Sequence, residues 1–217
     1  MSLADLHVHG APPPSLGAAL FVIATEMHER FAEVASFKEN ISLKSCILCS
    51  LTVRDFMIRI GFKDAEVRPC CFVIRADTLD GKEQLHSLAI GQPDFKMGKD
   101  RSKGGWWGHM VCVLPAAGWL IDTTLFQAKR VYWKELPGMF AAPLDPGERP
   151  VSVQDIDHHS LAAFRAVSGA GHVLRLQWLD QPENRYWKNG PDTAPYRRRP
   201  IVNQMVETYE SLQKRRT

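Results

Sequence analysis

One segment constrains the fold more than any other, because it forms a helix with almost no polar face. Between Ser45 and Ile60 apolar residues recur on nearly every side of the helix, and Gly61 follows as a stop signal. The apolar positions are Ile47, Leu48, Leu51, Val53, Phe56, Met57, Ile58 and Ile60. A helix that is apolar nearly all round must be covered by other elements. The sequence therefore predicts a central, buried helix over 45–60.

The rest of the chain predicts helices and strands that surround this helix. Apolar residues at helical spacing predict amphipathic helices over 16–35 and 201–216, and β-branched or alternating residues predict strands over 65–77 and 172–180. Elsewhere we expect a flexible loop over 80–104, a short strand over 129–136, a loop over 137–150, a short helix over 155–169 and irregular chain over 182–200. Helices followed by a mostly antiparallel sheet and a last helix are typical of the α+β class.

Size and composition indicate one globular domain. The 217 residues are 45% hydrophobic, and we expect a single domain over 1–217, with a core over about 15–135 and a C-terminal elaboration over about 136–217. No apolar run approaches the roughly 20 residues that span a bilayer, so we expect no membrane partner. A net charge of +3 is too small to indicate a nucleic-acid partner, and the basic clusters at 196–200 and 213–217 are expected to be solvated.

Cysteine usage indicates the compartment. The chain has five cysteines, an odd number, and its first residues do not resemble a secretory signal. Reduced thiols in a cytoplasmic protein fit this pattern better than a disulfide framework.

Three polar residues stand at the ends of predicted elements. His109 opens an apolar strand, the chain turns at 115–118, and the returning strand ends at Asp122. Strand-end polar residues are often purely structural. Cys46, however, stands at the predicted N-terminus of the buried helix, where the helix dipole stabilises a thiolate nucleophile. His109 is then a candidate general base and Asp122 the group that orients it.

The same residues carry a family resemblance. "SCILCSLTVRDFMIRIGFKDAEVRP" followed by "GHMVCVLPAAGWLIDTT" resembles the transglutaminase-like branch of the papain-like cysteine superfamily, and the arylamine N-acetyltransferases that share its core. The resemblance covers about residues 40–125 and implies a papain-like fold with a Cys46–His109–Asp122 triad. Gly61 lies 15 residues after Cys46, the separation found in those families, so the resemblance selects Cys46 over Cys49. "HMV" stands where transglutaminases have "HAW", and "LKSC" where the acetyltransferases have "RGG-x-C".

Further residues are candidates for substrate contact. Trp106 and Trp107 precede His109 and could wall a cleft, or pack under a loop. Asn40 could donate a hydrogen bond to an oxyanion, or belong to a turn before the helix. The glycine-rich segment 81–105 is expected to border the cleft as a mobile lid.

The expected function is a cysteine-dependent acyl-transfer enzyme, specifically an amide-bond hydrolase (peptidase or amidase) with a thioacyl intermediate. Its partner would be a peptide or a small amide or acyl substrate, and no cofactor or metal is expected. Three alternatives stay open: a non-catalytic peptide- or partner-binding domain of the same fold, an acyl-CoA-dependent N-acyltransferase, and a zinc-binding module.

Two sets of residues in the sequence carry the residue types that bind metals. Cys46-x-x-Cys49 with His109-x-x-Cys112 supplies four zinc-type ligands, but residues three apart on a strand face opposite sides. "DLHVHG" at 5–10 resembles the first metal motif of amidohydrolases, but no barrel-like alternation of strand and helix follows it.

Overall fold

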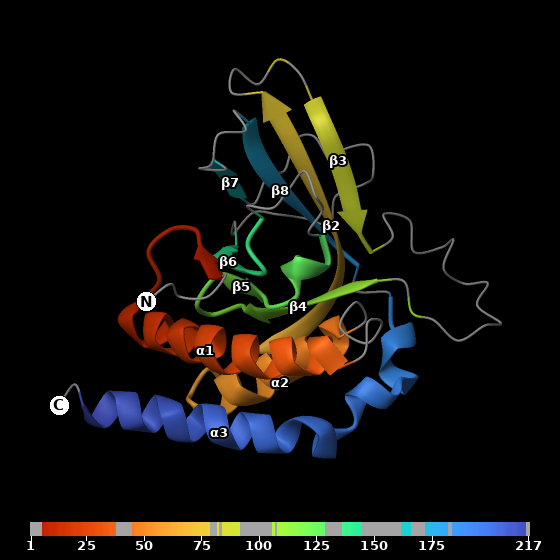
Figure 1. Ribbon diagram of the computed structural model, residues 1–217. Coiled ribbons are helices and arrows are strands. Elements are labelled where there is room, and N and C mark those ends of the chain that lie inside the picture. Colours follow the sequence, from red (N-terminus) through yellow and green to blue (C-terminus); the bar gives the residue numbers. More distant parts are fainter. Residues whose placement is uncertain are drawn as a thin grey trace.

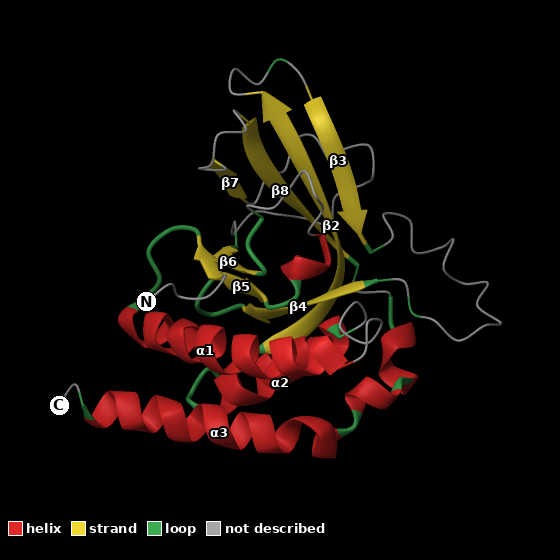
Figure 2. Cartoon of the chain, viewed as in Figure 1, coloured by secondary structure: helices red, strands yellow, loops and turns green. Residues whose placement is uncertain are grey.

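The molecule has a layer of helices on one side and a curled sheet on the other (Figures 1 and 2). The computed structural model describes residues 6–37, 45–78, 82, 84–91, 106, 108–128, 136–144, 162–165, 172–181 and 184–215. In these ranges the chain has three α-helices and eight strands, which confirms the α+β class. None of the described helices has a stretch both long and apolar enough to cross a lipid bilayer.

The central helix is α2 (Cys46–Arg59), which packs between α3 (Pro195–Lys214) and the sheet and also contacts α1 (Pro14–Phe37). Its buried residues are Cys46, Ile47, Cys49, Ser50, Leu51, Thr52, Val53, Phe56 and Met57. The prediction of a central, buried helix is therefore confirmed. Gly61 has a φ of +115°, a backbone conformation that residues other than glycine rarely adopt. This conformation turns the chain out of the helix.

The sheet is mixed. Its order is β1 (Leu6–Val8), β6 (Met139–Pro143), β5 (Trp119–Asp122), β4 (His109–Leu114), β2 (Glu66–Thr78), β8 (His172–Asp180) and β7 (Ala162–Arg165), with β3 (Gln84–Ile90) also paired to β2. Among the described strands, the edge pair of β1 and β6 is parallel and the other pairs are antiparallel. The long strand β2 joins the two halves of the sheet, because its first residues pair with β4 and its later ones with β3 and β8.

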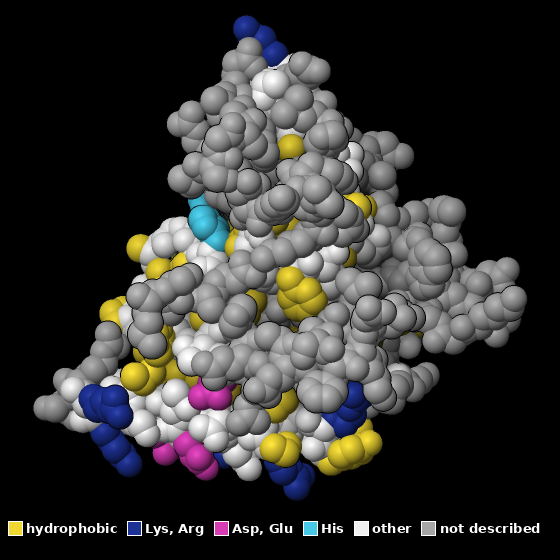
Figure 3. All heavy atoms as spheres, in the orientation of Figure 1, with side chains coloured by type: hydrophobic (Ala, Val, Ile, Leu, Met, Phe, Trp, Pro, Cys, Tyr) yellow, Lys and Arg dark blue, Asp and Glu magenta, His cyan; other side chains and the backbone are white. Residues whose placement is uncertain are grey.

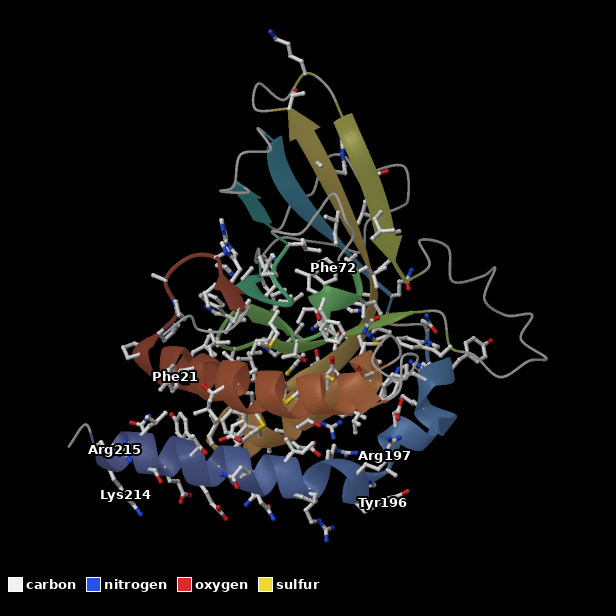
Figure 4. The ribbon with its side chains drawn as sticks, viewed as in Figure 1. Phe21, Phe72, Tyr196, Arg197, Lys214 and Arg215 are labelled. Carbon is white, nitrogen blue, oxygen red and sulfur yellow. The ribbon has the colours of Figure 1, made fainter. Side chains whose placement is uncertain are left out.

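Alternate residues of β4 pack on opposite faces of the sheet. Cys112 and Leu114 belong to the core shared with the helices, whereas Val111 and Val113 belong to a second core with Phe72. Because both faces are covered, all six residues of β4 are buried. Figure 4 shows Phe72 near the middle of the molecule, above the helical layer, whereas Arg197 and Arg215 lie at its margin.

Several sequence expectations are wrong in detail. The loop expected over 80–104 contains β3, the loop over 137–150 contains β6, and the helix over 155–169 contains β7. The third helix begins at Pro195, inside the segment expected to be irregular. Of the short strand expected over 129–136, only Leu136 lies among the described residues.

The chain after residue 136 belongs to the same layers as the expected core. It supplies β6 and β8 to the sheet, and α3 contributes Val202 and Met205 to the core beneath α2.

An ion pair fastens α3 to α2. The guanidinium of Arg198, a residue only 6% exposed, donates from Nε to Asp55 Oδ2 at 2.5 Å and from Nη1 to the carbonyl oxygen of Thr193 at 2.7 Å. Arg54 donates to the other carboxylate oxygen of Asp55. The start of α3 and the turn before it are thereby held against α2.

We expect Asp55→Ala to lower the free energy of unfolding by roughly 2–3 kcal/mol, because it leaves the buried Arg198 without its carboxylate. Asp192→Ala is the matched control: its ion pair with Arg197 is partly exposed and should contribute about 0–1 kcal/mol. Urea unfolding of both variants measures the difference, and equal losses would contradict the role given to Asp55.

Candidate active site

His109 and Asp122 meet at one end of the β4–β5 hairpin. His109 is the first residue of β4 and Asp122 the last of β5, and neither side chain is exposed. The two atoms His109 Nε2 and Asp122 Oδ2 lie 2.8 Å apart. Since an ionised carboxylate can only accept, Nε2 carries the proton and donates it, and the second ring nitrogen, Nδ1, is left for another group.

Thr124 holds the carboxylate in place. Its backbone N–H donates to Asp122 Oδ1 at 2.8 Å, and its hydroxyl donates to the same oxygen at 3.1 Å. One carboxylate oxygen therefore serves the turn and the other serves His109. Thr124 was not among the residues expected at the site, although an aspartate that accepts from the backbone N–H two residues on is a recognised turn pattern.

The environment of His109 favours the imidazolium. Burial acts to lower the pKa of His109, but the charge and hydrogen bond of Asp122, assisted by Cys46, outweigh it and raise the pKa to about 10. The edge of the imidazole meets Phe72, with ring centroids 5.7 Å apart at an interplanar angle of 77°. His109 is thus oriented by Asp122 and packed by an aromatic ring.

Cys46 also acts on the imidazole of His109. In the described part of the chain Nδ1 of His109 has no hydrogen bond of regular geometry, and the hydrogen bonding and charge of the Cys46 side chain contribute to the raised pKa of this histidine. Cys46 is the first residue of α2, and the side chain of Ser45 makes no capping hydrogen bond there. The N–H groups of that turn and the helix dipole therefore favour an anion at this position.

A buried hydrogen bond fixes the helix against the strand. The Ser50 hydroxyl donates to the carbonyl oxygen of Met110 at 2.8 Å. Ser50 lies one turn after Cys46, and Met110 directly follows His109. This bond sets the height of α2 relative to β4, and so the placement of Cys46 beside His109.

The other four thiols have different surroundings. Cys46 is 5% exposed, whereas Cys49, Cys70, Cys71 and Cys112 are 0% exposed. Burial raises the pKa of the Cys71 thiol to about 12 and also raises the pKa of the Cys49 and Cys112 thiols. These three thiols remain protonated near neutral pH.

Trp106 packs beside Cys46 and is held from the C-terminal part of the chain. Its Nε1 donates to Asn184 Oδ1 at 2.8 Å, and it packs against a cluster made of Cys46, Ile47, Leu51 and Met110. Trp187 packs against the same cluster, and neither Asn184 nor Trp187 was expected at the site from the sequence. Trp107 and Asn40 lie outside the described residues.

Part of the expected lid is a strand. Residues 84–90 form β3, so the prediction of a flexible loop is wrong there, and 92–105 lie outside the described residues. Gly91 directly follows β3, has a φ of +89° and lies against the backbone of His109. A Cβ added to Gly91 would lie 3.0 Å from the backbone nitrogen of His109 and 2.9 Å from the backbone carbonyl oxygen of Cys70.

Neither metal motif forms a ligand cluster. Where the structure describes the chain, no three His, Cys, Asp or Glu side chains gather as metal ligands would. His7, from "DLHVHG", stacks on Phe140 of β6, and burial lowers the pKa of this histidine.

Comparison of the chain with protein-family models, with curated proteins and with solved structures gave no match.

The raised pKa of His109 gives stability a predictable pH dependence. Between its ordinary pKa of 6.5 and about 10, the folded protein keeps a proton that the unfolded chain loses. The stabilisation is complete below about pH 6.5 and is lost as the pH rises towards 10. From pH 7 to 8, in the Cys46→Ala protein, where the proton on His109 cannot come from the thiol, we expect the free energy of unfolding to fall by on the order of 1 kcal/mol more than in Cys46→Ala/Asp122→Asn. Parallel urea titrations measure this difference; identical slopes would contradict the buried charge pair.

The contact between Gly91 and His109 predicts a stability difference between two glycines. In Gly91→Ala, the alanine must adopt a left-handed backbone conformation and its Cβ lies too close to backbone atoms of its neighbours. In Gly118→Ala, the backbone conformation is also left-handed (φ +67°), but no atom lies within 4 Å of the new Cβ. We expect about 1–2 kcal/mol of destabilisation for Gly118→Ala and a clearly larger loss for Gly91→Ala. Thermal unfolding of the two variants tests this, and a Gly91→Ala protein no less stable than Gly118→Ala would refute the close approach.

Proposed function

We propose that the protein is a cysteine-dependent acyl-transfer enzyme, an amide-bond hydrolase in which Cys46 is the nucleophile, His109 the general base and Asp122 the orienting carboxylate. The observation that carries the proposal is the buried His109–Asp122 pair, which leaves Nδ1 of the imidazole to Cys46 at a helix N-terminus. Nucleophile, base and orienting group in this order are what covalent acyl transfer requires.

In the first half of the reaction, the proton of the Cys46 thiol passes to Nδ1 of His109, which forms the imidazolium that Asp122 stabilises, and the sulfur attacks the carbonyl carbon of an amide. The oxyanion of the tetrahedral intermediate is stabilised by N–H groups at the start of α2. The intermediate collapses as the carbon–nitrogen bond breaks, and His109 returns the proton to the leaving amine. The products of this half are a free amine and a thioester on Cys46.

In the second half, water resolves the thioester. His109 takes a proton from the water as its oxygen attacks the carbonyl carbon, the carbon–sulfur bond breaks, and the proton returns to the sulfur of Cys46. A carboxylic acid leaves. An amine in place of the water would give acyl transfer by the same steps. Throughout, Asp122 holds the imidazole and stabilises its charged form.

A papain-like, transglutaminase-like fold is part of the proposal. It is supported by the order of elements: the cysteine opens the central helix, the histidine opens a strand of the sheet, and the aspartate closes the next strand. None of the five cysteines forms a disulfide, and a nucleophilic thiol is preserved under reducing conditions, so the cytoplasm is the proposed location.

The first test is alkylation of the native protein. We expect iodoacetamide at pH 6–7 to modify Cys46 at least about tenfold faster than any other cysteine, because only this thiol combines a helix N-terminus with a histidine. His109→Asn should slow the modification of Cys46 by about 100-fold. Peptide mapping by mass spectrometry measures each site.

Cys49→Ser is the matched control, because Cys49 lies one turn along the same helix and should leave the rate at Cys46 unchanged. A small activated ester such as p-nitrophenyl acetate should also acylate Cys46 in the wild type and not in His109→Asn. If Cys46 reacts no faster than the buried thiols, the proposal of an enzyme fails and a non-catalytic binding domain becomes the better interpretation.

A further inference from the structure

A groove of about 600 Å³ lies beside the Cys46 cluster. One wall is the start of β2, residues Glu66–Pro69, and the other is Arg185, Trp187 and Lys188, which lie in or next to the short helix η6 (Tyr186–Asn189). We call it the β2–η6 groove. Val67 and Trp187 line the groove and also pack against the cluster that contains Cys46, so these two side chains join the groove to the candidate active site.

At the start of the β2 wall, the described strands pair with β2 on one side. There Glu66–Pro69 pair with β4, whereas on the other side β8 reaches β2 only from Cys70 onward. The Pro69 carbonyl oxygen points to that second side, where it accepts from the Gln181 N–H at 2.9 Å. Because backbone groups alternate along a strand, those of Val67 point the same way, into the groove. Such an edge can accept an extended peptide as an added strand.

The charge of the groove favours anions. Glu66 is bound by Arg68 at 2.7 Å, so its charge is compensated within the β2 wall. Arg185 and Lys188 are both exposed on the opposite wall, and in the described part of the chain neither has a carboxylate within ion-pair distance. Lys188 lies 5.8 Å from the centre of the Trp187 ring, which keeps its ammonium group at the groove.

We infer that the β2–η6 groove binds an acidic, extended segment of a peptide substrate. The peptide main chain would pair with the Val67 edge of β2, and its carboxylates would contact Arg185 and Lys188. This inference rests on the proposed function, because it takes the groove to lead the peptide towards Cys46. It names a substrate class: peptides with acidic residues to one side of the bond that Cys46 attacks.

Binding is tested with the Cys46→Ala protein, which retains the groove but cannot turn the peptide over. The probes are three fluorescein-labelled octapeptides in which valine alternates with glutamate, glutamine or lysine. We expect the glutamate peptide to bind tightest, and the double variant Arg185→Gln/Lys188→Gln to weaken it by about 3- to 10-fold, the effect of two exposed ion pairs. Fluorescence anisotropy at low and high salt measures the affinities, and the preference should shrink as salt rises.

Arg199→Gln/Arg215→Gln is the matched control. It removes the same charge from one exposed position in α3 and one directly after it, both outside the groove, and Figure 4 shows Arg215 at the far end of that helix from η6. Figure 3 shows Lys and Arg side chains along the helical margin, so the control also measures general attraction by the surface. Equal weakening by the two double variants would overturn the inference, as would equal binding of the three peptides.

A protection experiment links the groove to Cys46 and separates the two proposals. In the wild type, the glutamate peptide should slow alkylation of Cys46 by iodoacetamide, and the glutamine peptide should not. If Cys46 is reactive but the glutamate peptide gives no protection, the enzyme proposal stands and the groove is not its substrate site. If the peptide binds but Cys46 is unreactive, the enzyme proposal fails and the groove binds acidic peptides without catalysis.

Discussion

The arrangement of the site depends on a charge pair placed where water does not reach. His109 and Asp122 are both fully buried, and burying either charge alone would be costly. Their direct hydrogen bond, together with the two bonds from Thr124 to the other carboxylate oxygen, supplies the compensation. Because these bonds require β4 and β5 to be in one register, the pair also specifies the hairpin: a shift by one residue would turn Asp122 to the opposite face.

The third member of the site comes from a separate element and is positioned by packing. α2 is held on the sheet side by the Ser50–Met110 bond and on the other side by the Asp55–Arg198 pair. With the helix fixed from both sides, its first residue, Cys46, has little freedom to move away from His109. The burial of the helix therefore fixes the position of its N-terminus, where the Ser45 side chain makes no capping hydrogen bond, as well as stabilising the fold.

The parts that the sequence predicts well are those set by local pattern. The all-round apolar character of 45–60 and the hairpin with its turn at 115–118 depend on nearby residues, and both are present in the structure. β3, β6 and β7 were missed because short segments between glycines and prolines become strands only through a partner strand. Trp187 and Asn184 were missed because their contacts to the Cys46 cluster and to Trp106 join positions far apart in the chain.

The segment after β8 connects these observations. The backbone N–H of its first residue, Gln181, donates to the carbonyl oxygen of Pro69 in β2. Asn184 then accepts the hydrogen bond of Trp106, and Trp187 packs against the Cys46 cluster. The segment then leads into α3. Arg198 in the first turn of α3 binds Asp55 of α2, the helix that begins with Cys46. The segment lies outside residues 40–125, which carry the family resemblance. The two parts are in contact but encoded separately. If the proposed function holds, changes in this later segment would alter substrate preference while the geometry of the central helix and hairpin is kept.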